Sequence, residues 1–471
     1  MRVQATASHG RWTWVLGAGA LAVASAALAL ATPVIAMDLF LLFGAGIVVL
    51  ALDRADRPPA MLGVVAALGL YFSTGVGTVD LPVIVPLAAT LWLVTELTQR
   101  RVVARPPRDL VAALGLFAIG LVLGIVRGPA GREGLRTMVI LGWLLCVGRL
   151  SALLAADNRS AVLLRGYSAV AGLFGIVNVV FFVFPSLEEA YFGGWISHVF
   201  VEPDSIRKLV VGDVLNNALS PLKAATLYIN ANVAAMFFGT AAWVAHGNWR
   251  GSPWRWMLVV ACALGAIATA SRGGALGGAV SLAAWAGLQV TRARLGAVVA
   301  RVAAGAVVLA GGIAALASLQ SGGFNRFAWK TVSSDPRLLL WGAAVSLGST
   351  HPVLGSGFGA WEAFWPGIAR VVDLRPSFPP HNVYLYLWII GGLTAALGFL
   401  WIAVAALRTA RKLALERQAS AVEVLAAGAV VSWCWSQATF ENFFFLDYRI
   451  GFLLAVLLGG LAARGRATVA G

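Results

Sequence analysis

Long apolar runs separated by short polar breaks cover most of the chain. A helix that crosses a membrane needs about 20 mainly apolar residues. Runs of this length predict about fourteen spans, although the third and last runs are short and Arg149 interrupts the sixth, so a count of about twelve stays open. The runs lie near residues 12–31, 33–52, 59–74, 79–98, 110–127, 136–155, 161–184, 223–245, 254–270, 273–290, 297–319, 383–407, 421–440 and 450–463.

The composition supports a membrane as the surroundings of these helices. Hydrophobic residues make up 60% of the 471 positions and charged residues only 12%, whereas soluble globular proteins carry about 25% charged residues. No soluble core can hide this much apolar surface. We therefore predict an all-α, polytopic integral membrane helical bundle of about 12–14 transmembrane helices with one large extracytoplasmic loop.

The basic residues indicate an orientation rather than a nucleic-acid partner. The net charge of +15 comes from Lys and Arg in short clusters between apolar runs, without the basic stripe that nucleic-acid binding requires. Cytoplasmic loops of membrane proteins are enriched in Lys and Arg. A cytoplasmic N-terminus places DRADRPP, QRRVVARPPR and TRARLGAVVAR inside. An even number of spans then makes both termini cytoplasmic.

Two outer loops on this topology are long, near residues 185–222 and 320–382. Long ordered loops are candidate functional elements. We therefore divide the chain into three parts. Residues 1–319 hold about eleven transmembrane helices. Residues 320–382 form the large extracytoplasmic loop with a surface helix, and residues 383–471 form the C-terminal transmembrane helices.

The first candidate motif is the turn TASRGGALGG, residues 269–278, which faces outward between two spans. Ser271 suits the N-cap of the following helix, which places Arg272 in its first turn. Gly273 and Gly274 leave backbone N–H groups open at the positive end of the helix dipole, so the turn fits an anion. The alternative is an ordinary arginine at a helix end whose side chain extends to the interface.

Residues 333–344, SSDPRLLLWGAA, repeat this logic in the large outer loop. Ser334 or Asp335 can cap a helix whose first turn contains Arg337. The helix is mostly apolar, includes Trp341 and suits the membrane surface. A basic residue at a helix start is unfavourable unless an anion lies nearby. That anion is Asp335 on one interpretation and a phosphate on the other, since a guanidinium matches phosphate oxygens bidentately.

The stretch FPPHNVYLYLWIIGG, residues 378–392, places His381 and Asn382 at the start of a long apolar helix. A helix start and nearby arginines favour the neutral imidazole at pH 7. A neutral imidazole can take a proton from a hydroxyl. Asn382 can cap the helix or orient a polar group. The alternative for His381 is an interfacial residue bonded to a loop carbonyl.

The remaining polar motifs point less clearly to chemistry. His9 and His246 face the cytoplasm on this topology, and His198 and His351 are interpreted as structural residues. The glycine run at residues 351–361 lacks the Lys-Ser/Thr pair of a nucleotide-binding loop. The outer loops contain no Asp-x-Asp or paired-carboxylate signature, and the three cysteines lie in apolar segments without metal-ligand spacing. We therefore expect neither a metal nor a cofactor.

The order of these motifs resembles the O-antigen ligase and polymerase superfamily over about residues 269–400. The chain departs from that family at Ile389-Ile390, where an acidic residue is common, and at Ala395, where glycine is common. The matching passages are Ser271-Arg272-Gly273, Arg337 to Trp341, His351 to Gly359 and His381 to Gly392.

The resemblance implies an enzyme of the bacterial inner membrane whose active site faces the periplasm. Family members transfer a glycan, without a metal, from an undecaprenyl-diphosphate carrier to an acceptor hydroxyl. The acceptor is lipid A–core for a ligase and another lipid-linked glycan for an O-antigen or exopolysaccharide polymerase, and both remain open. The family's essential residues carry over as Arg272 and Arg337 for the diphosphate and His381 as general base. The substrate-binding residues expected beside them are Ser271, Gly273, Trp341, Asn382 and Tyr384.

Two other classes of membrane protein remain as alternatives. A transporter or a flippase for lipid-linked oligosaccharides places charges along a path within the bilayer and often contains inverted repeats. Here the mid-span charges are few, namely Asp38, Arg149 and Arg165, and no repeat is apparent. A structural membrane protein would leave the outward-facing arginines and histidine unexplained.

Overall fold

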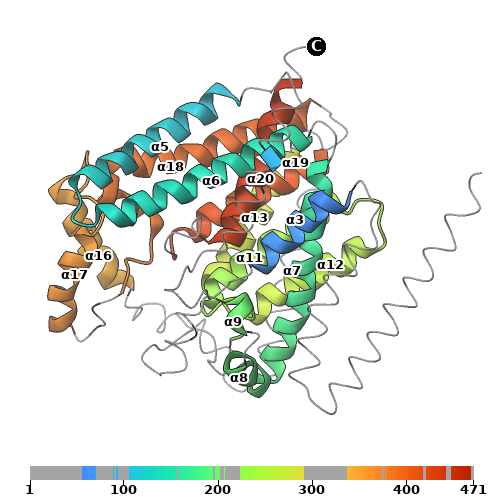
Figure 1. The fold of residues 1–471 in the computed structure, drawn as a ribbon, viewed down its shortest axis with the longest axis horizontal. Coiled ribbons are helices and arrows are strands. Elements are labelled where there is room, and N and C mark those ends of the chain that lie inside the picture. The colour runs from blue at the N-terminus through green and yellow to red at the C-terminus, as the bar shows by residue number, and fades with distance from the viewer. Residues whose placement is uncertain are drawn as a thin grey trace, which may run out of the picture.

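Every regular element among the residues that the structure describes is a helix (Figure 1). The computed structural model describes residues 56–69, 106–155, 159–194, 197–201, 223–290, 337–372, 378–416, 421–441 and 447–467, with a few single positions between them. The helices are α3 (Arg57–Leu68), α5 (Arg108–Arg127), α6 (Gly131–Ala155), α7 (Arg159–Val183), α8 (Pro185–Gly193), α9 (Ser197–Phe200), α11 (Ala231–Asn248), α12 (Trp254–Ala268), α13 (Arg272–Val290), α16 (Arg337–Thr350), α17 (Ala360–Val371), α18 (Val383–Leu415), α19 (Ala421–Gln437) and α20 (Tyr448–Ala467).

The predicted fold class is confirmed. Four of these helices, α5, α6, α7 and α18, are long and apolar enough to cross a membrane. Helix α6 runs through Arg149 without a break, so the sixth predicted span is a continuous helix. The predicted span at 223–245 is wrong at its start, because Asn230 caps α11 and the helix begins at Ala231. The predicted spans near 12–31, 33–52 and 297–319 and most of 79–98 lie outside the described residues.

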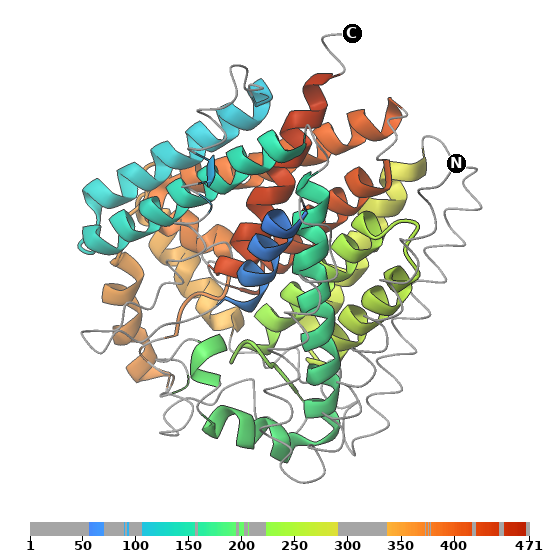
Figure 2. The same ribbon diagram turned by 45° about the vertical axis from the view of Figure 1, so that its right-hand side comes forward.

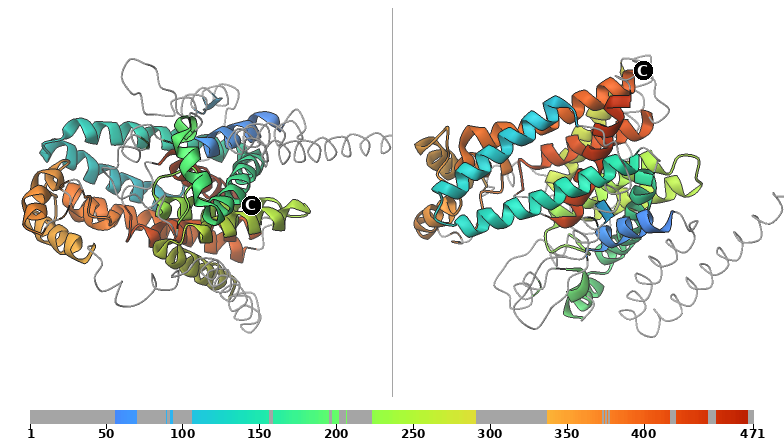
Figure 3. Two further views of the ribbon diagram at one scale, coloured as in Figure 1. Left: turned by 90° about the horizontal axis from the view of Figure 1, so that it is seen from below. Right: turned by 45° about the horizontal axis from the view of Figure 1, so that its top comes forward.

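The segment predicted as the large outer loop, residues 320–382, contains more helix than the sequence predicts. Helix α16 begins at Arg337, as expected for a helix with an arginine in its first turn. Helix α17 follows it and was not predicted. The two lie at one end of the long helices α5, α6 and α18 (Figure 1 and Figure 3). The proposed caps Ser334 and Asp335 lie outside the described residues.

Small residues let the long helices approach closely. Helix α18 packs along α5, α6 along α20, and α3 along α7, as Figure 2 shows for the last pair. A Cβ added at Gly459 of α20 would lie 2.0 Å from the carbonyl oxygen of Gly148 in α6. Such contacts are typical of membrane helices, which associate through backbone packing rather than through a hydrophobic driving force.

Helix α18 is kinked where the glycine-rich loop at residues 351–359 packs into it. The backbone leaves helical geometry at Gly391 and Gly392. The N–H of Ser356 donates to the carbonyl of Ile389 (2.6 Å), and the N–H of Leu393 donates to a carbonyl of the loop (2.9 Å). Non-helical backbone at membrane depth is tolerated where protein groups satisfy it. The glycine run at 351–361 therefore supplies partners for the broken helix.

The same loop fixes the connection between α5 and α6. The N–H of Phe358 donates to the carbonyl of Gly124 (3.0 Å), and the N–H of Ala130 donates back to the carbonyl of Phe358 (3.0 Å). Arg127 donates through Nε to the carbonyl of Gly355 (3.1 Å). The loop thus ties the α5–α6 connection to the kink in α18.

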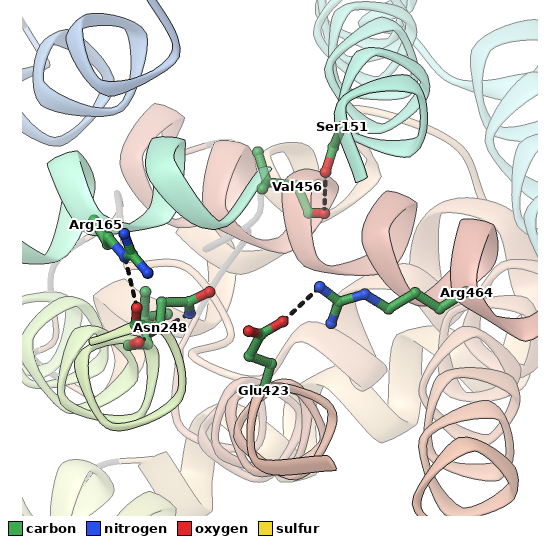
Figure 4. Close-up of polar contacts among 7 residues, drawn as sticks. Ser151, Arg165, Asn248, Glu423, Val456 and Arg464 are labelled. Carbon is green, nitrogen blue, oxygen red and sulfur yellow. Dashed lines mark hydrogen bonds and ion pairs between the residues drawn. The ribbon is translucent and has the colours of Figure 1, made fainter. Parts of the chain in front are cut away.

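The other end of the bundle carries its own polar contacts (Figure 4). Arg165 donates through Nε to the carbonyl of Asn248 (2.7 Å). Glu423 pairs with Arg464. The first contact joins the start of α7 to the end of α11, and the second joins the start of α19 to the end of α20. Each contact therefore connects two helices that run in opposite directions. We call the contacts among Arg165, Asn248, Glu423 and Arg464 the α7–α20 polar contacts.

Candidate active site

Ser271 caps the start of α13, as predicted. Its Oγ accepts the N–H of Gly274 (2.9 Å), and its hydroxyl donates to Oδ1 of Asn232 (2.6 Å). Arg272 is therefore the first residue of the helix. The prediction that the Gly274 N–H stays open to an anion is wrong. This glycine instead permits close packing, because a Cβ there would lie 2.5 Å from the Cβ of Ala235 on α11.

Asn382 caps the start of α18 in the same manner. Its side-chain oxygen accepts the N–H of Leu385 (3.0 Å), which confirms the capping prediction. His381 lies immediately before this cap and is partly buried. Its ring contacts the ring of Phe378 edge to face, with 6.2 Å between centroids. The imidazole is therefore placed at the helix start by a capped turn and an aromatic contact.

The residues that precede the two caps share an unusual backbone conformation. Ala270 (φ 47°) and His381 (φ 49°) are the non-glycine residues in the described part of the chain with positive φ. A side chain in this region costs about 1–3 kcal/mol, and such positions cluster at functional sites. The surrounding structure therefore imposes the turn at both helix starts.

All three predicted motifs contact the turn that follows α19, residues 438–441, which we call the α19 turn. Gly273 lies against Phe440, since a Cβ added to Gly273 would be 3.6 Å from the Cβ of Phe440. The ring of Trp341 packs on the ring of Phe440, with 5.8 Å between centroids. The N–H of Val383 donates to the first carbonyl of the turn (2.8 Å). The starts of α13 and α18 and the first turns of α16 are thereby brought together.

The predicted site side chains have different surroundings. Arg272 and Arg337 are partly buried at the starts of their helices. The indole N–H of Trp341 is buried and finds no hydrogen-bond acceptor among the described residues. The hydroxyl of Tyr384 donates to the carbonyl of Trp435 (2.7 Å), so it anchors α18 to α19. A role of these residues in substrate binding stays a prediction.

Sequence reasoning missed a set of buried polar side chains behind the two caps. They break apolar runs in NAN and in WSQATFEN, but two of them fall inside the predicted span at 223–245, where they were counted as part of a helix. Burying polar groups in a membrane protein is costly and commonly marks function. The residues are Asn232, Gln437 and Glu441, which are buried, and Asn230, which is partly buried.

The described residues contain no group of three or more His, Cys, Asp or Glu side chains placed to hold a metal ion. Cys262 and Cys434 are buried free thiols, and Cys146 is a partly buried one. This agrees with the interpretation of the cysteines as small residues of the apolar segments.

Residues 257–400 match the family model described as O-antigen ligase. The match supports membership of the O-antigen ligase and polymerase family over this segment of the chain. It confirms the resemblance carried by the four motifs, which covers nearly the same residues. The apolar helices indicate an integral membrane protein, and the matched segment supports an activity of the glycosyltransferase type in general. No curated protein matches the chain.

The O-antigen ligase segment contains some but not all of the site. It includes Arg272, Arg337 and His381 together with the loop that packs into the α18 kink. Helices α11 and α19, which contribute the buried polar side chains and the α19 turn, lie outside the matched residues. The surroundings of the motifs therefore come from parts of the chain that the match does not cover.

Proposed function

We propose that the protein transfers a glycan from an undecaprenyl-diphosphate carrier to an acceptor hydroxyl at the outer face of the bacterial inner membrane. The acceptor is lipid A–core for an O-antigen ligase and a lipid-linked glycan for a polymerase. The observation that carries the proposal is the convergence of all three motifs on the α19 turn. Motifs that are far apart in sequence thus meet at one end of the bundle.

Arg272 and Arg337 bind the diphosphate in this proposal. Each lies in the first turn of its helix, where the helix dipole favours an anion. Hydrogen bonds between charged partners contribute about 1.5–3 kcal/mol each. A guanidinium fork also holds two phosphate oxygens at once. The same contacts stabilise the diphosphate as it leaves with the electron pair of the broken bond.

His381 acts as the general base on the acceptor. Its neutral ring takes the proton of the hydroxyl while that oxygen forms a bond to the anomeric carbon and the bond to the diphosphate breaks. Direct displacement inverts the anomeric centre. Proton transfer by a positioned side chain contributes typically about 10²–10⁴-fold in rate. The capped, left-handed turn supports this role because it fixes the backbone of His381.

The test is deletion of the gene followed by analysis of surface glycan and carrier-linked glycan together. Long chains that remain on the carrier indicate a ligase. Single repeats transferred to the acceptor indicate a polymerase. Single repeats that remain on the carrier indicate a defect before transfer, as loss of a flippase would produce. Unchanged glycans in both pools would contradict the proposal for the pathway tested.

A further inference from the structure

A continuous chain of hydrogen bonds runs from the α19 turn to the first turn of α13. Nδ2 of Asn230 donates a hydrogen bond to Oε2 of Glu441 (3.1 Å), and Oδ1 of Asn230 accepts the N–H of Asn232 (2.9 Å). Oδ1 of Asn232 then accepts the hydroxyl of Ser271 (2.6 Å), whose Oγ accepts the N–H of Gly274 (2.9 Å). The chain ends on the backbone turn that carries Arg272.

A second branch holds the middle of this chain. Gln437 donates through Nε2 to the backbone carbonyl of Asn232 and accepts the indole N–H of Trp433 (2.8 Å). Asn232 is therefore held through both its side chain and its carbonyl. Three helices, α11, α13 and α19, are joined by these contacts.

Most of this chain is shielded from water, and Asn230 within it is partly buried. Gln437 is 0% exposed, Glu441 2%, Ser271 6% and Asn232 7%. A buried polar group that loses its partner costs about 1–3 kcal/mol, so these hydrogen bonds favour one arrangement of the three helices. Apolar side chains would fill the same space without this risk. The retained polar chain therefore fixes a geometry rather than merely filling the core.

We propose that Glu441 and Asn232 are positioning residues that hold the start of α13 so that Arg272 meets the diphosphate at one fixed place. This proposal rests on the proposed function. The need for such support follows from catalysis itself, since a misplacement of about 1 Å can cost about 10²-fold in rate. The left-handed turn at Ala270 adds to that need, because the backbone holds its strain only when neighbouring groups impose it.

The first test measures glycan transfer by purified protein with a lipid-diphosphate-linked glycan as donor. Asn232→Ala removes the acceptor of the Ser271 hydroxyl, so we expect kcat to fall by about 10-fold to 100-fold with little change in the KM for the donor. Asn232→Asp keeps an acceptor at that position and should recover most of the rate. Unchanged kcat in Asn232→Ala, or no recovery in Asn232→Asp, would overturn the proposal.

Thr240→Ala is the matched control for this test. Thr240 is also buried on α11, but its hydroxyl donates only to the carbonyls of Met236 (2.7 Å) and Phe237 (3.1 Å) in its own helix. It should leave kcat unchanged. If Asn232→Ala does not fold, two variants of Ser271 replace it. Ser271→Ala removes the hydroxyl that donates to Asn232, whereas Ser271→Thr keeps a hydroxyl there. The difference in kcat between these two variants is then the test.

The second test is at the far end of the chain. Glu441→Gln keeps an oxygen that accepts the Asn230 amide and should transfer at close to the wild-type rate, whereas Glu441→Leu should lose kcat. Equal losses in the two variants would contradict positioning through this hydrogen bond. Absence of transfer by the wild-type protein would contradict the proposed function instead, so the two failures are distinguishable.

Discussion

The two polar regions of the bundle differ in how their side chains are used. In the α7–α20 polar contacts, Arg165 donates to a carbonyl at a helix end, and the Glu423–Arg464 pair is partly exposed, at 27% and 18%. Around the α19 turn, the polar side chains are buried and joined to one another across three helices. Left-handed turns precede both caps there.

This difference distinguishes contacts that stabilise the bundle from a site whose geometry is fixed before a substrate binds. The α7–α20 polar contacts complete helix ends and neutralise charges, which any folded bundle requires. The α19 turn is surrounded by polar and strained groups that a bundle does not need for folding. Substitutions in the first region should therefore change stability modestly, and substitutions around the second should change transfer.

The largest effect is expected from Gly392→Ala, at the kink of α18. The residue has φ 65° and ψ −163°, a conformation open essentially to glycine, and an added Cβ would lie 2.0 Å from the carbonyl oxygen of Val353. The backbone strain alone costs about 1–3 kcal/mol. Thermal unfolding in detergent should show a large loss of stability and little folded protein.

Gly287→Ala is the control for that experiment. Gly287 lies within α13, and a Cβ there meets nothing within 4 Å. Replacing a glycine in a helix interior by alanine gains about 0.5–1 kcal/mol. A wild-type unfolding temperature for Gly392→Ala would contradict the described kink.

Arg337→Lys is expected to have the next largest effect. The substitution keeps the positive charge but loses the fork that binds two phosphate oxygens. One lost charge-assisted hydrogen bond of about 1.5–3 kcal/mol corresponds to about 10-fold to 100-fold in transfer rate. Arg464→Lys, the same change in the α7–α20 polar contacts, should leave the rate unchanged. Equal rates for the two variants would remove bidentate diphosphate binding from the account.

A small effect is expected from Glu423→Gln. Partly exposed ion pairs contribute about 0.2–1 kcal/mol, so the unfolding temperature should shift slightly while transfer is preserved. A loss of transfer comparable to that of Arg337→Lys, measured at equal amounts of protein, would show that the two regions do not differ as described.

No effect on transfer is expected from a chelator. In the proposed mechanism, the guanidinium groups of Arg272 and Arg337 supply the positive charge that a metal supplies in other transferases. Purified protein treated with a strong chelator should therefore transfer glycan at the untreated rate. If the chelator abolished transfer and added divalent metal restored it, the reaction would require a metal, which would contradict the account.

Local features of the site could be predicted from the sequence, because capping depends on adjacent residues. Ser271 and Asn382 cap their helices as expected from their type and position. The long helices follow from hydropathy alone. The start of α11 was predicted wrongly, because hydropathy alone counted Asn230 within the span at 223–245 although asparagine is a preferred N-cap residue.

Contacts between distant segments could not be predicted. Asn230 and Glu441 are hydrogen-bonded although they lie 211 positions apart. The glycine run near His351 gave no indication that its N–H groups would satisfy the carbonyls of a broken α18. Such pairings depend on how the helices pack, and the pattern along the chain does not carry that information.

The central claim is that His381 is the general base at the start of α18. The most direct test is the transfer rate of purified His381→Ala, with His198→Ala as control because His198 is an exposed histidine of the short helix α9, hydrogen-bonded to its neighbour Ser197. The account predicts a loss of about 10²-fold or more for His381→Ala at unchanged protein stability, and a wild-type rate for His198→Ala. A wild-type rate for His381→Ala would contradict it.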